Sequence, residues 1–226
     1  MKAEDLRAIN AARAAREAVA YVVPLAGGPG RIVERGADDP LAEPLQALFA
    51  TGKSRRLEGA AQDGGDLFAR IYRPSPRLVI VGAVHAAQVL APMAAACEFA
   101  VTIVDPREAF AAADRFAGVS IVAEWPDADV LALDAETAVA TLSHDPKIDD
   151  PALQIALNAG CFYVGALGSR KTHAKRVERF VAAGFGEEAI GRIHAPIGLN
   201  IGSATPAEIA VSILAEIIEA LRKGGR

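Results

Sequence analysis

The segment Arg77-Leu-Val-Ile-Val-Gly-Ala-Val-His85 decides the fold that we expect for this chain. Its unbroken apolar and mostly β-branched run predicts a strand that is buried on both faces. Gly82 then permits a tight turn into an alanine-rich helix over residues 86–96. Such a pair forms the first unit of a Rossmann-like sheet, where ligands bind at the carboxyl edge and the helix offers free N–H groups to an anion. We therefore expect the function to lie near Gly82 and His85.

Predicted strands and helices alternate from residue 77 onward. Further strands are predicted at 99–104, 119–123 and 161–166, with alternative positions for the fourth strand at 129–133 and 137–143. Helices are predicted at 151–158, 171–183 and 206–223. The last one opens with Thr205-Pro-Ala-Glu208, which combines a capping residue, proline at the first helical position and glutamate three residues after the cap. Residues 75–226 are therefore predicted to form an α/β domain, with a mostly parallel sheet and helices on both faces.

Residues 1–74 differ in character and predict a small N-terminal α+β region. Helices are expected at 4–20 and 41–51 and strands at 21–25 and 66–72, with a hairpin turn at Asp63-Gly-Gly65. The linker Arg73-Pro-Ser-Pro76 favours extended backbone, as at many domain boundaries.

The composition excludes several classes of protein. Its 52% hydrophobic and 5% aromatic content suits helices packed on a parallel sheet. A net charge of −4 argues against nucleic-acid binding, and no basic stripe is expected along a helix. Two cysteines, Cys97 and Cys161, are too few for a disulfide framework or a zinc site, so we expect a reducing, cytoplasmic setting. A signal peptide and a bilayer-spanning run are both missing from the sequence, which predicts no membrane insertion.

Asp105 raises the question of dinucleotide binding. It follows Gly82 by 23 positions, where a dinucleotide fold places the carboxylate that binds a ribose. However, Val84 and Ala87 occupy positions that the dinucleotide fingerprint reserves for glycine, and a branched side chain there obstructs the pyrophosphate. The alternative role for Asp105 is to cap a turn before Pro106.

All four histidines, His85, His144, His173 and His194, fall at predicted strand ends or beside turns that contain glycine. A metal site is not expected, because their spacing matches no compact metal-binding motif. In the segment Ser143-His-Asp-Pro-Lys147, His144 and Asp145 are suited to orienting a ligand or exchanging protons, and a simple turn is the alternative.

Two later segments suggest a ligand with an anionic group and a flat ring. In Gly165-Ala-Leu-Gly-Ser-Arg-Lys-Thr-His173, Ser169 can cap the next helix, while Arg170 and Lys171 bring cations to its first turn. Cations are unfavourable at a helix N-terminus, so a phosphate-like anion is expected there. The loop His194-Ala-Pro-Ile-Gly-Leu-Asn-Ile-Gly202, which contains Asn200, can clasp a flat ring or serve as a packed connector.

Long motifs of the second domain resemble one known family. They are Leu142-Ser-His-Asp-Pro-Lys-Ile-Asp-Asp-Pro-Ala-Leu153, Tyr163-Val-Gly-Ala-Leu-Gly-Ser-Arg-Lys-Thr-His173 and Ile193-His-Ala-Pro-Ile-Gly-Leu-Asn-Ile-Gly-Ser-Ala-Thr-Pro-Ala-Glu-Ile-Ala-Val-Ser-Ile213. Together with Leu78-Val-Ile-Val-Gly-Ala-Val-His85 and Val104-Asp-Pro-Arg107, they resemble the C-terminal domain of the XdhC/CoxI family over residues 75–222. Members of that family are accessory proteins of xanthine dehydrogenase and related molybdenum hydroxylases.

The resemblance implies a chaperone rather than an enzyme. Such a protein binds the molybdenum cofactor (molybdopterin), assists its sulfuration with a cysteine desulfurase, and delivers it to apo-xanthine dehydrogenase or a related hydroxylase. Molybdopterin combines a flat pterin with a phosphate, which agrees with the ligand expected from the residues. The residues that we expect to bind it are Gly82, Val84, His85, Asp105, His144, Asp145, Gly165, Ser169, Arg170, His173, His194 and Asn200.

Two alternatives remain open at this stage. One is an NAD(P)-dependent oxidoreductase that uses the Asp105 loop. The other is a paralogue that docks on a hydroxylase without any ligand, because the family's usual N-terminal Gly-Gly-Cys-Val-Glu motif is absent and no cysteine precedes Cys97. The final helix, rich in alanine and isoleucine, is also suited to forming a homodimer.

Overall fold

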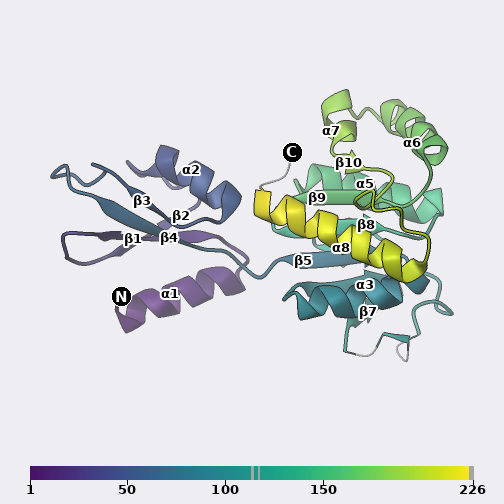
Figure 1. Cartoon of the computed structure of the whole chain (residues 1–226), viewed down its shortest axis with the longest axis horizontal. Helices are drawn as coiled ribbons and strands as arrows, with labels where there is room; N and C mark the ends of the chain where they lie inside the picture. The colour runs from purple at the N-terminus through teal and green to yellow at the C-terminus, as the bar shows by residue number, and fades with distance from the viewer. Residues whose placement is uncertain (113–114, 117, 224–226) are drawn as a thin grey trace. The chain divides into compact units, whose positions relative to one another are not determined.

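A computed structural model describes residues 1–112, 115–116 and 118–223 of the chain (Figure 1). The chain forms two compact units, Met1–Ser75 and Pro76–Arg226. The predicted fold class is confirmed, because the second unit is an α/β domain with a parallel sheet and the first combines helices with a small antiparallel sheet.

The N-terminal unit is a four-stranded antiparallel sheet with a helix on each face. Its strand order is β2 (Arg31–Glu34), β1 (Val19–Pro24), β4 (Leu67–Tyr72) and β3 (Arg55–Leu57). Successive residues of β1 point to opposite faces. Val19 and Tyr21 pack with helix α1 (Ala3–Ala14), while Ala20 and Val22 pack with helix α2 (Ala42–Thr51).

One expectation for this unit needs correction, and two strands were not predicted. The helix predicted at 4–20 ends at Ala14, because Arg16 adopts a left-handed conformation with φ of 63° and strand β1 begins soon afterwards at Val19. Strands β2 and β3 were not predicted, since each is only three or four residues long and largely exposed. The second helix ends as expected at Gly52, which has a φ of 66°.

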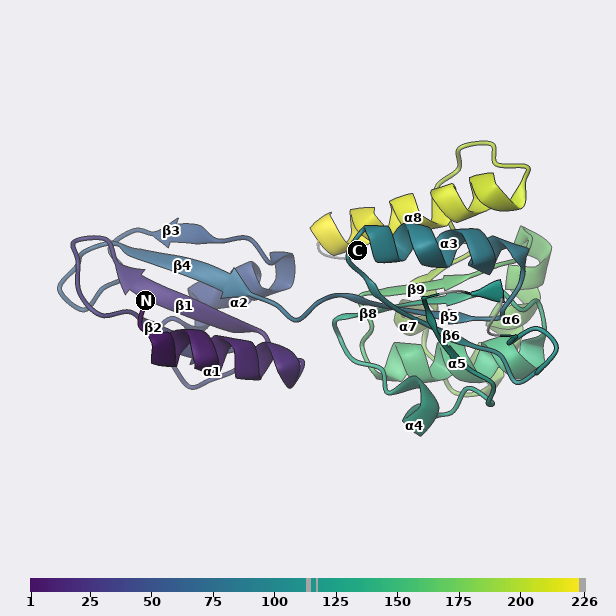
Figure 2. The same ribbon diagram turned by 90° about the horizontal axis from the view of Figure 1, so that it is seen from below.

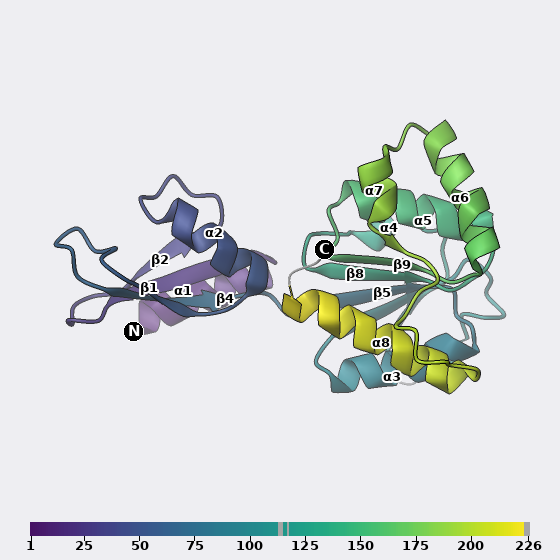
Figure 3. The same cartoon turned by 45° about the horizontal axis from the view of Figure 1, so that its top comes forward.

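The second unit contains a six-stranded parallel sheet in the order β10 (Ile193–His194), β9 (Tyr163–Ala166), β8 (Thr137–Thr141), β5 (Arg77–Val81), β6 (Ala100–Val104) and β7 (Ser120–Val122). Helices α3 (His85–Ala96) and α8 (Pro206–Lys223) cover one face of this sheet (Figure 2). The other face carries α4 (Ala128–Leu131), α5 (Pro146–Asn158), α6 (Arg170–Ala182) and α7 (Glu187–Gly191) (Figure 3).

Strand β5 is buried on both faces, as its sequence predicts. Leu78 and Ile80 pack into the core beneath α3 and α8, while Val79 and Val81 pack into the core beneath α5. The strands that follow β5 lead first to β6 and β7 on one side and then to β8, β9 and β10 on the other. The crevice at the carboxyl ends of β5 and β8, where the order reverses, is where sheets of this kind bind ligands.

Other boundaries in this unit differ from the prediction. Residues 128–131 form a short helix rather than a strand, because the Asp127 side chain accepts a hydrogen bond from the Val130 amide and caps it. Helix α5 begins at Pro146 instead of 151, since Asp145 caps it and a proline is well suited to the first helical position. Strand β10 and helix α7 are both very short and were not predicted.

The predicted cap of the final helix is confirmed. The Glu208 carboxylate accepts hydrogen bonds from the amides of Ala204 and Thr205, and the Thr205 hydroxyl accepts one from the Glu208 amide. Within the described ranges, none of the helices combines the length and the apolar character needed to cross a membrane.

Candidate functional site

The loop after β5 is packed directly against the end of β8. Gly82 has a φ of 109°, and a Cβ atom placed on it would lie 2.6 Å from the Ser143 nitrogen and 2.9 Å from the Ser143 Cα. Glycine is therefore required here for two reasons, backbone conformation and space. Gly82 brings the loops after β5 and β8 together at the point where the strand order reverses.

Asp105, at the end of β6, fixes this first loop from the other side. Its side chain is fully buried, and it accepts hydrogen bonds from the Ala83 amide at 2.8 Å and from the Arg107 guanidinium at 2.7 and 2.8 Å. The Arg107 amide adds a fourth bond at 3.0 Å. Burial acts to raise the pKa of the Asp105 carboxyl, but these hydrogen bonds outweigh burial and hold the pKa below its ordinary value. The oxygens that would bind a ribose are thus already used within the domain.

The loop after β8 places a second buried carboxylate near the first loop. Asp149 accepts a hydrogen bond from the Ser143 hydroxyl at 2.7 Å, and burial raises the pKa of the Asp149 carboxyl. His144 is exposed and has a φ of 62°, while Asp145 caps helix α5 through the Lys147 amide. The charge of Arg107 also interacts with Asp145 and Asp149. The loops after β5, β6 and β8 therefore form one connected group.

Helix α6 begins at the same edge of the sheet. The Ser169 hydroxyl accepts a hydrogen bond from the Thr172 amide at 3.2 Å, so the predicted cap is confirmed. Arg170 is exposed at the first helical position. His173 is half-buried, and both burial and the nearby charge of Arg176 lower its pKa. Arg170 brings positive charge to the carboxyl edge of β9.

Helix α6 is rich in basic residues, although one of them, Arg176, is buried. Over its 13 residues, this helix carries five basic side chains, Arg170, Lys171, Lys175, Arg176 and Arg179. These side chains concentrate positive charge locally in a chain whose formal net charge is −4.

Gly165 and the loop after β10 pack against each other. A Cβ atom on Gly165 would lie 2.6 Å from the Ile197 side chain, so the space beside this buried glycine is filled by the loop. The Ile197 amide also donates a hydrogen bond to the Ala166 carbonyl at 3.2 Å. Residues 195–204 thus form a packed connector at Ile197, while Asn200 is exposed.

Glu216 of helix α8 holds His194 and the loop in place. Its carboxylate accepts hydrogen bonds from the Tyr163 hydroxyl at 2.6 Å and the Gly198 amide at 2.8 Å, and it lies 3.0 Å from the His194 Nδ1. The rings of Tyr163 and His194 are 4.6 Å apart between centroids. Burial acts to raise the pKa of the Glu216 carboxyl, but the bonds from His194, Tyr163 and Gly198 outweigh it and lower the pKa. This network fixes the orientation of the His194 ring.

We expect Glu216→Gln to lower the free energy of unfolding by about 2 kcal/mol at neutral pH, because it removes charge-assisted hydrogen bonds. A carboxyl with a lowered folded pKa stabilises the protein above its unfolded pKa, about 4.3 for glutamate, and this contribution fades as the pH falls. Urea unfolding between pH 7 and pH 3 should therefore show the two proteins converging at acid pH. Glu187→Gln, at an exposed position of α7, is the matched control. A difference that stays constant with pH would contradict this role of the charge.

The structure brings most of the expected residues to one edge of the sheet. The loops that contain Gly82, Asp105 and Asp145 are directly linked, and His173 joins them through Arg176 and Asp149. Val84 and His85 open helix α3 at the same edge. His194 belongs to the separate network around Glu216.

Sequence reasoning missed several residues that organise this edge. Arg107 follows Asp105 by two positions, a spacing that favours a local pair and could have been noticed. Asp149 and Arg176 carried no such signal. The predicted helix began at 151, so Asp149 was placed outside it. Arg176 lies within a helix rich in charged residues, and its burial depends on the tertiary fold.

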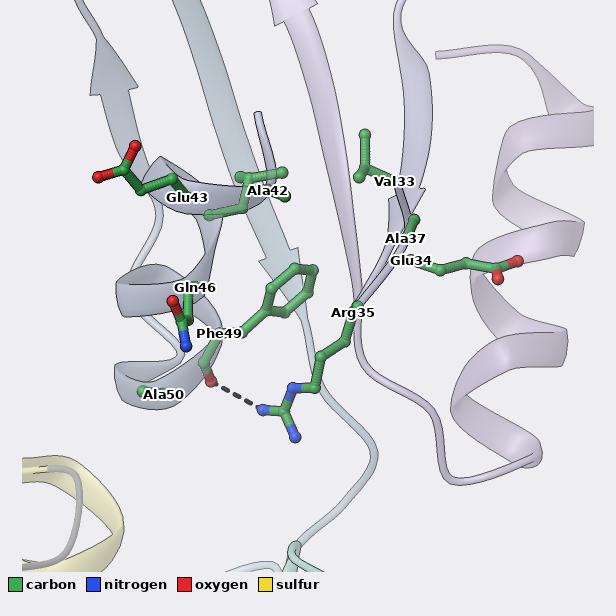
Figure 4. A pocket seen from close by; sticks show the side chains of 11 residues that line it. Val33, Glu34, Arg35, Ala37, Ala42, Glu43, Gln46, Phe49 and Ala50 are labelled. Atoms are coloured by element: carbon green, nitrogen blue, oxygen red, sulfur yellow. Dashed lines mark hydrogen bonds between the residues drawn. The ribbon is translucent and has the colours of Figure 1, made fainter. Parts of the chain in front are cut away.

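The described part of the chain also contains a cavity of about 700 Å³ between β2 and α2 of the N-terminal unit. There the Arg35 guanidinium donates a hydrogen bond to the Phe49 carbonyl at 3.0 Å and lies 5.6 Å from the centroid of its ring (Figure 4). Figure 4 shows the carboxylates of Glu34 and Glu43 directed away from this space. Because the polar groups do not converge there, we assign the candidate site to the sheet edge.

In the part of the chain that the structure describes, no three His, Cys, Asp or Glu side chains gather as metal ligands would. The sheet edge instead combines helix N-termini, basic side chains and carboxylates that form hydrogen bonds and ion pairs within the domain. The second unit is thus a Rossmann-type domain in which the carboxylate at the end of β6, Asp105, is bonded within the domain.

The chain belongs to the XdhC family. The XdhC Rossmann domain matches residues 78–217, which confirms the resemblance seen in the sequence.

Similar proteins agree with this assignment. The molybdenum cofactor insertion chaperone PaoD of Escherichia coli (strain K12) is 34% identical over 146 residues, which cover 65% of this chain and 40% of PaoD. A protein of Bacillus subtilis (strain 168), named as a probable xanthine dehydrogenase subunit, is 28% identical over 183 residues, covering 80% of this chain and 53% of that protein. The chain therefore spans about half, or less, of the length of these curated relatives.

One solved structure shares the fold of almost the whole chain. The crystal structure of a xanthine dehydrogenase from Bacillus halodurans matches with a TM-score of 0.66 and 21% identity. The match covers 97% of this chain and 64% of the other.

Proposed function

We propose that this protein binds the molybdenum cofactor and acts in the maturation of a xanthine dehydrogenase-type molybdenum hydroxylase. Family membership supports the general role, since one relative is named a molybdenum cofactor insertion chaperone. The proposal carries this role over to the present chain, with an apo-hydroxylase as its partner in the cytoplasm. A cysteine desulfurase and a second copy of the chain are further proposed partners.

The residues of the sheet edge fit a ligand that ends in a phosphate. Helix α3 opens with Val84 at its N-cap, a side chain that cannot accept a hydrogen bond from the first amides. Helix α6 begins with the cations Arg170 and Lys171 beside the positive end of its dipole. Both helix ends favour an anion, and the cofactor supplies one at the end of its pterin. When bound, the cofactor provides the molybdenum centre that the hydroxylase needs.

The burial of Asp105 is the observation that argues most strongly against an NAD(P)-dependent oxidoreductase. A dinucleotide fold uses this carboxylate to bind the adenosine ribose. Here the carboxylate already accepts four hydrogen bonds from Ala83 and Arg107, and Val84 stands where the pyrophosphate needs a glycine. A ribose would have to displace Arg107 from the buried Asp105 carboxylate.

We expect Arg170→Ala to weaken binding of the molybdenum cofactor several-fold, because it removes a positive charge from the first turn of α6, beside the place where we propose that the phosphate binds. The measurement is anaerobic calorimetric titration of the purified chain. Arg7→Ala removes an exposed arginine from the N-terminal unit and should leave the affinity unchanged. Equal affinity of Arg170→Ala and the unmodified protein would remove Arg170 from the site.

A further inference from the structure

A small pocket lies between helices α5 and α6, next to the carboxyl edge of the sheet. Its volume is about 280 Å³, several times the roughly 30 Å³ that one water occupies in the liquid. His144 and Asp149 line it from the α5 side, and Lys171, Lys175 and Arg176 line it from α6. The pocket is suited to a small charged group.

Arg176 is the unusual member of this pocket. Its side chain is 4% exposed, yet the Nε and Nη1 atoms have no hydrogen-bond partner among the described residues. Its Nη2 donates to the Leu167 carbonyl at 3.3 Å, and its Nε lies 3.8 Å from the nearest Asp150 oxygen, beyond hydrogen-bond distance. Buried donors without acceptors are costly and rare in folded proteins. The guanidinium therefore has N–H donors that none of the described residues uses.

The neighbouring carboxylates of Asp149 and Asp150 do not accept hydrogen bonds from these Arg176 donors. Asp150 is engaged by Arg179, whose Nη2 donates to it at 3.0 Å, and Asp149 accepts from the Ser143 hydroxyl. Burial also raises the pKa of the Asp149 carboxyl, because a buried site disfavours the charged form. Four basic side chains of α6, Lys171, Lys175, Arg176 and Arg179, face two carboxylates, so positive charge is in excess.

We propose that this pocket binds a phosphate group, with the Arg176 guanidinium as its principal donor and Lys175 and Lys171 at the rim. A guanidinium presents its N–H groups in a rigid fork that matches phosphate oxygens, and such charge-assisted bonds are strong. The proposal that the phosphate is the one on the molybdenum cofactor rests on the proposed function. The phosphate site itself depends only on the chemistry of these side chains.

The first test is titration of the full chain with inorganic phosphate, followed by phosphorus NMR. We expect saturable binding that weakens at least tenfold in Arg176→Lys, because the ammonium lacks the fork. Since a change at a buried position can affect folding, Lys175→Gln provides a second variant at an exposed position and should weaken binding at least threefold. Lys53→Gln, in the N-terminal unit, is the matched control. Lack of saturable binding, or equal binding by all variants, would overturn the proposal.

The second test separates this inference from the proposed function. The unmodified chain is titrated with molybdenum cofactor in the presence and absence of inorganic phosphate, and with dephosphorylated cofactor. Competition by phosphate and at least tenfold weaker binding of the dephosphorylated form would support the inference. Cofactor binding that neither treatment changes would overturn the inference and leave the proposed function intact. Phosphate binding without cofactor binding would support the anion site and overturn the proposed function.

Discussion

Gly82→Ala should lower the free energy of unfolding by about 4 kcal/mol, the sum of backbone strain and overpacking. The new methyl group would lie 2.6 Å from the Ser143 nitrogen, and its contacts are backbone atoms that cannot move aside as a flexible side chain can. The φ of 109° adds a conformational cost for any residue with a Cβ. Chemical denaturation followed by circular dichroism measures the change.

A matched glycine separates the two causes. Gly184 has a φ of 90°, but a Cβ atom placed there would meet no described atom within 4 Å. Gly184→Ala should therefore cost only the conformational part, about 1 kcal/mol. If both variants lose the same free energy of unfolding, then the close contact between the loops after β5 and β8 is not the reason why position 82 requires glycine.

Asp105→Ala should lower the free energy of unfolding by about 3 kcal/mol at neutral pH. The change leaves the buried Ala83 amide without its acceptor and removes the carboxylate that holds the Arg107 guanidinium. The effect is below that of a fully buried pair, because Arg107 is one-third exposed and its charge stays partly hydrated. Denaturant unfolding at pH 7 gives the magnitude.

The pH dependence of this change has a definite sign. The pKa of the Asp105 carboxyl is lower in the folded protein, so its contribution is complete above its unfolded pKa, about 3.9, and fades as the pH falls. Asp105→Asn keeps one acceptor oxygen without the charge and should cost about half as much. A fully stable Asp105→Ala protein at pH 7 would contradict the role of this carboxylate in fixing the first loop.

The sequence predicted the second unit well because its signals are local and repeated. The apolar run of β5, the glycine after it and the capped start of α8 each follow from a few adjacent residues, and the structure confirms all three. The short elements were harder to predict. Strands β3 and β10, of three and two residues, depend on pairing with a neighbouring strand rather than on their own pattern.

The candidate site could be located from the sequence, but its internal contacts could not. Strand ends predict which loops share an edge, and this placed Gly82, Asp105 and His144 in one region. Which side chains are buried against one another depends on packing between segments far apart in the chain. Arg176 and Leu167 meet only after helix α6 folds back toward the end of β9, and Glu216 reaches His194 across 22 positions.

We propose above that this Rossmann-type domain binds the molybdenum cofactor rather than a dinucleotide. Anaerobic calorimetric titration of the purified chain with molybdenum cofactor, NAD and NADP in parallel tests it most directly. We expect saturable binding of the cofactor and none of either dinucleotide, because Asp105 is bonded to Arg107 and Val84 stands where the pyrophosphate needs a glycine. Binding of a dinucleotide in place of the cofactor, or of none of the three ligands, would contradict it.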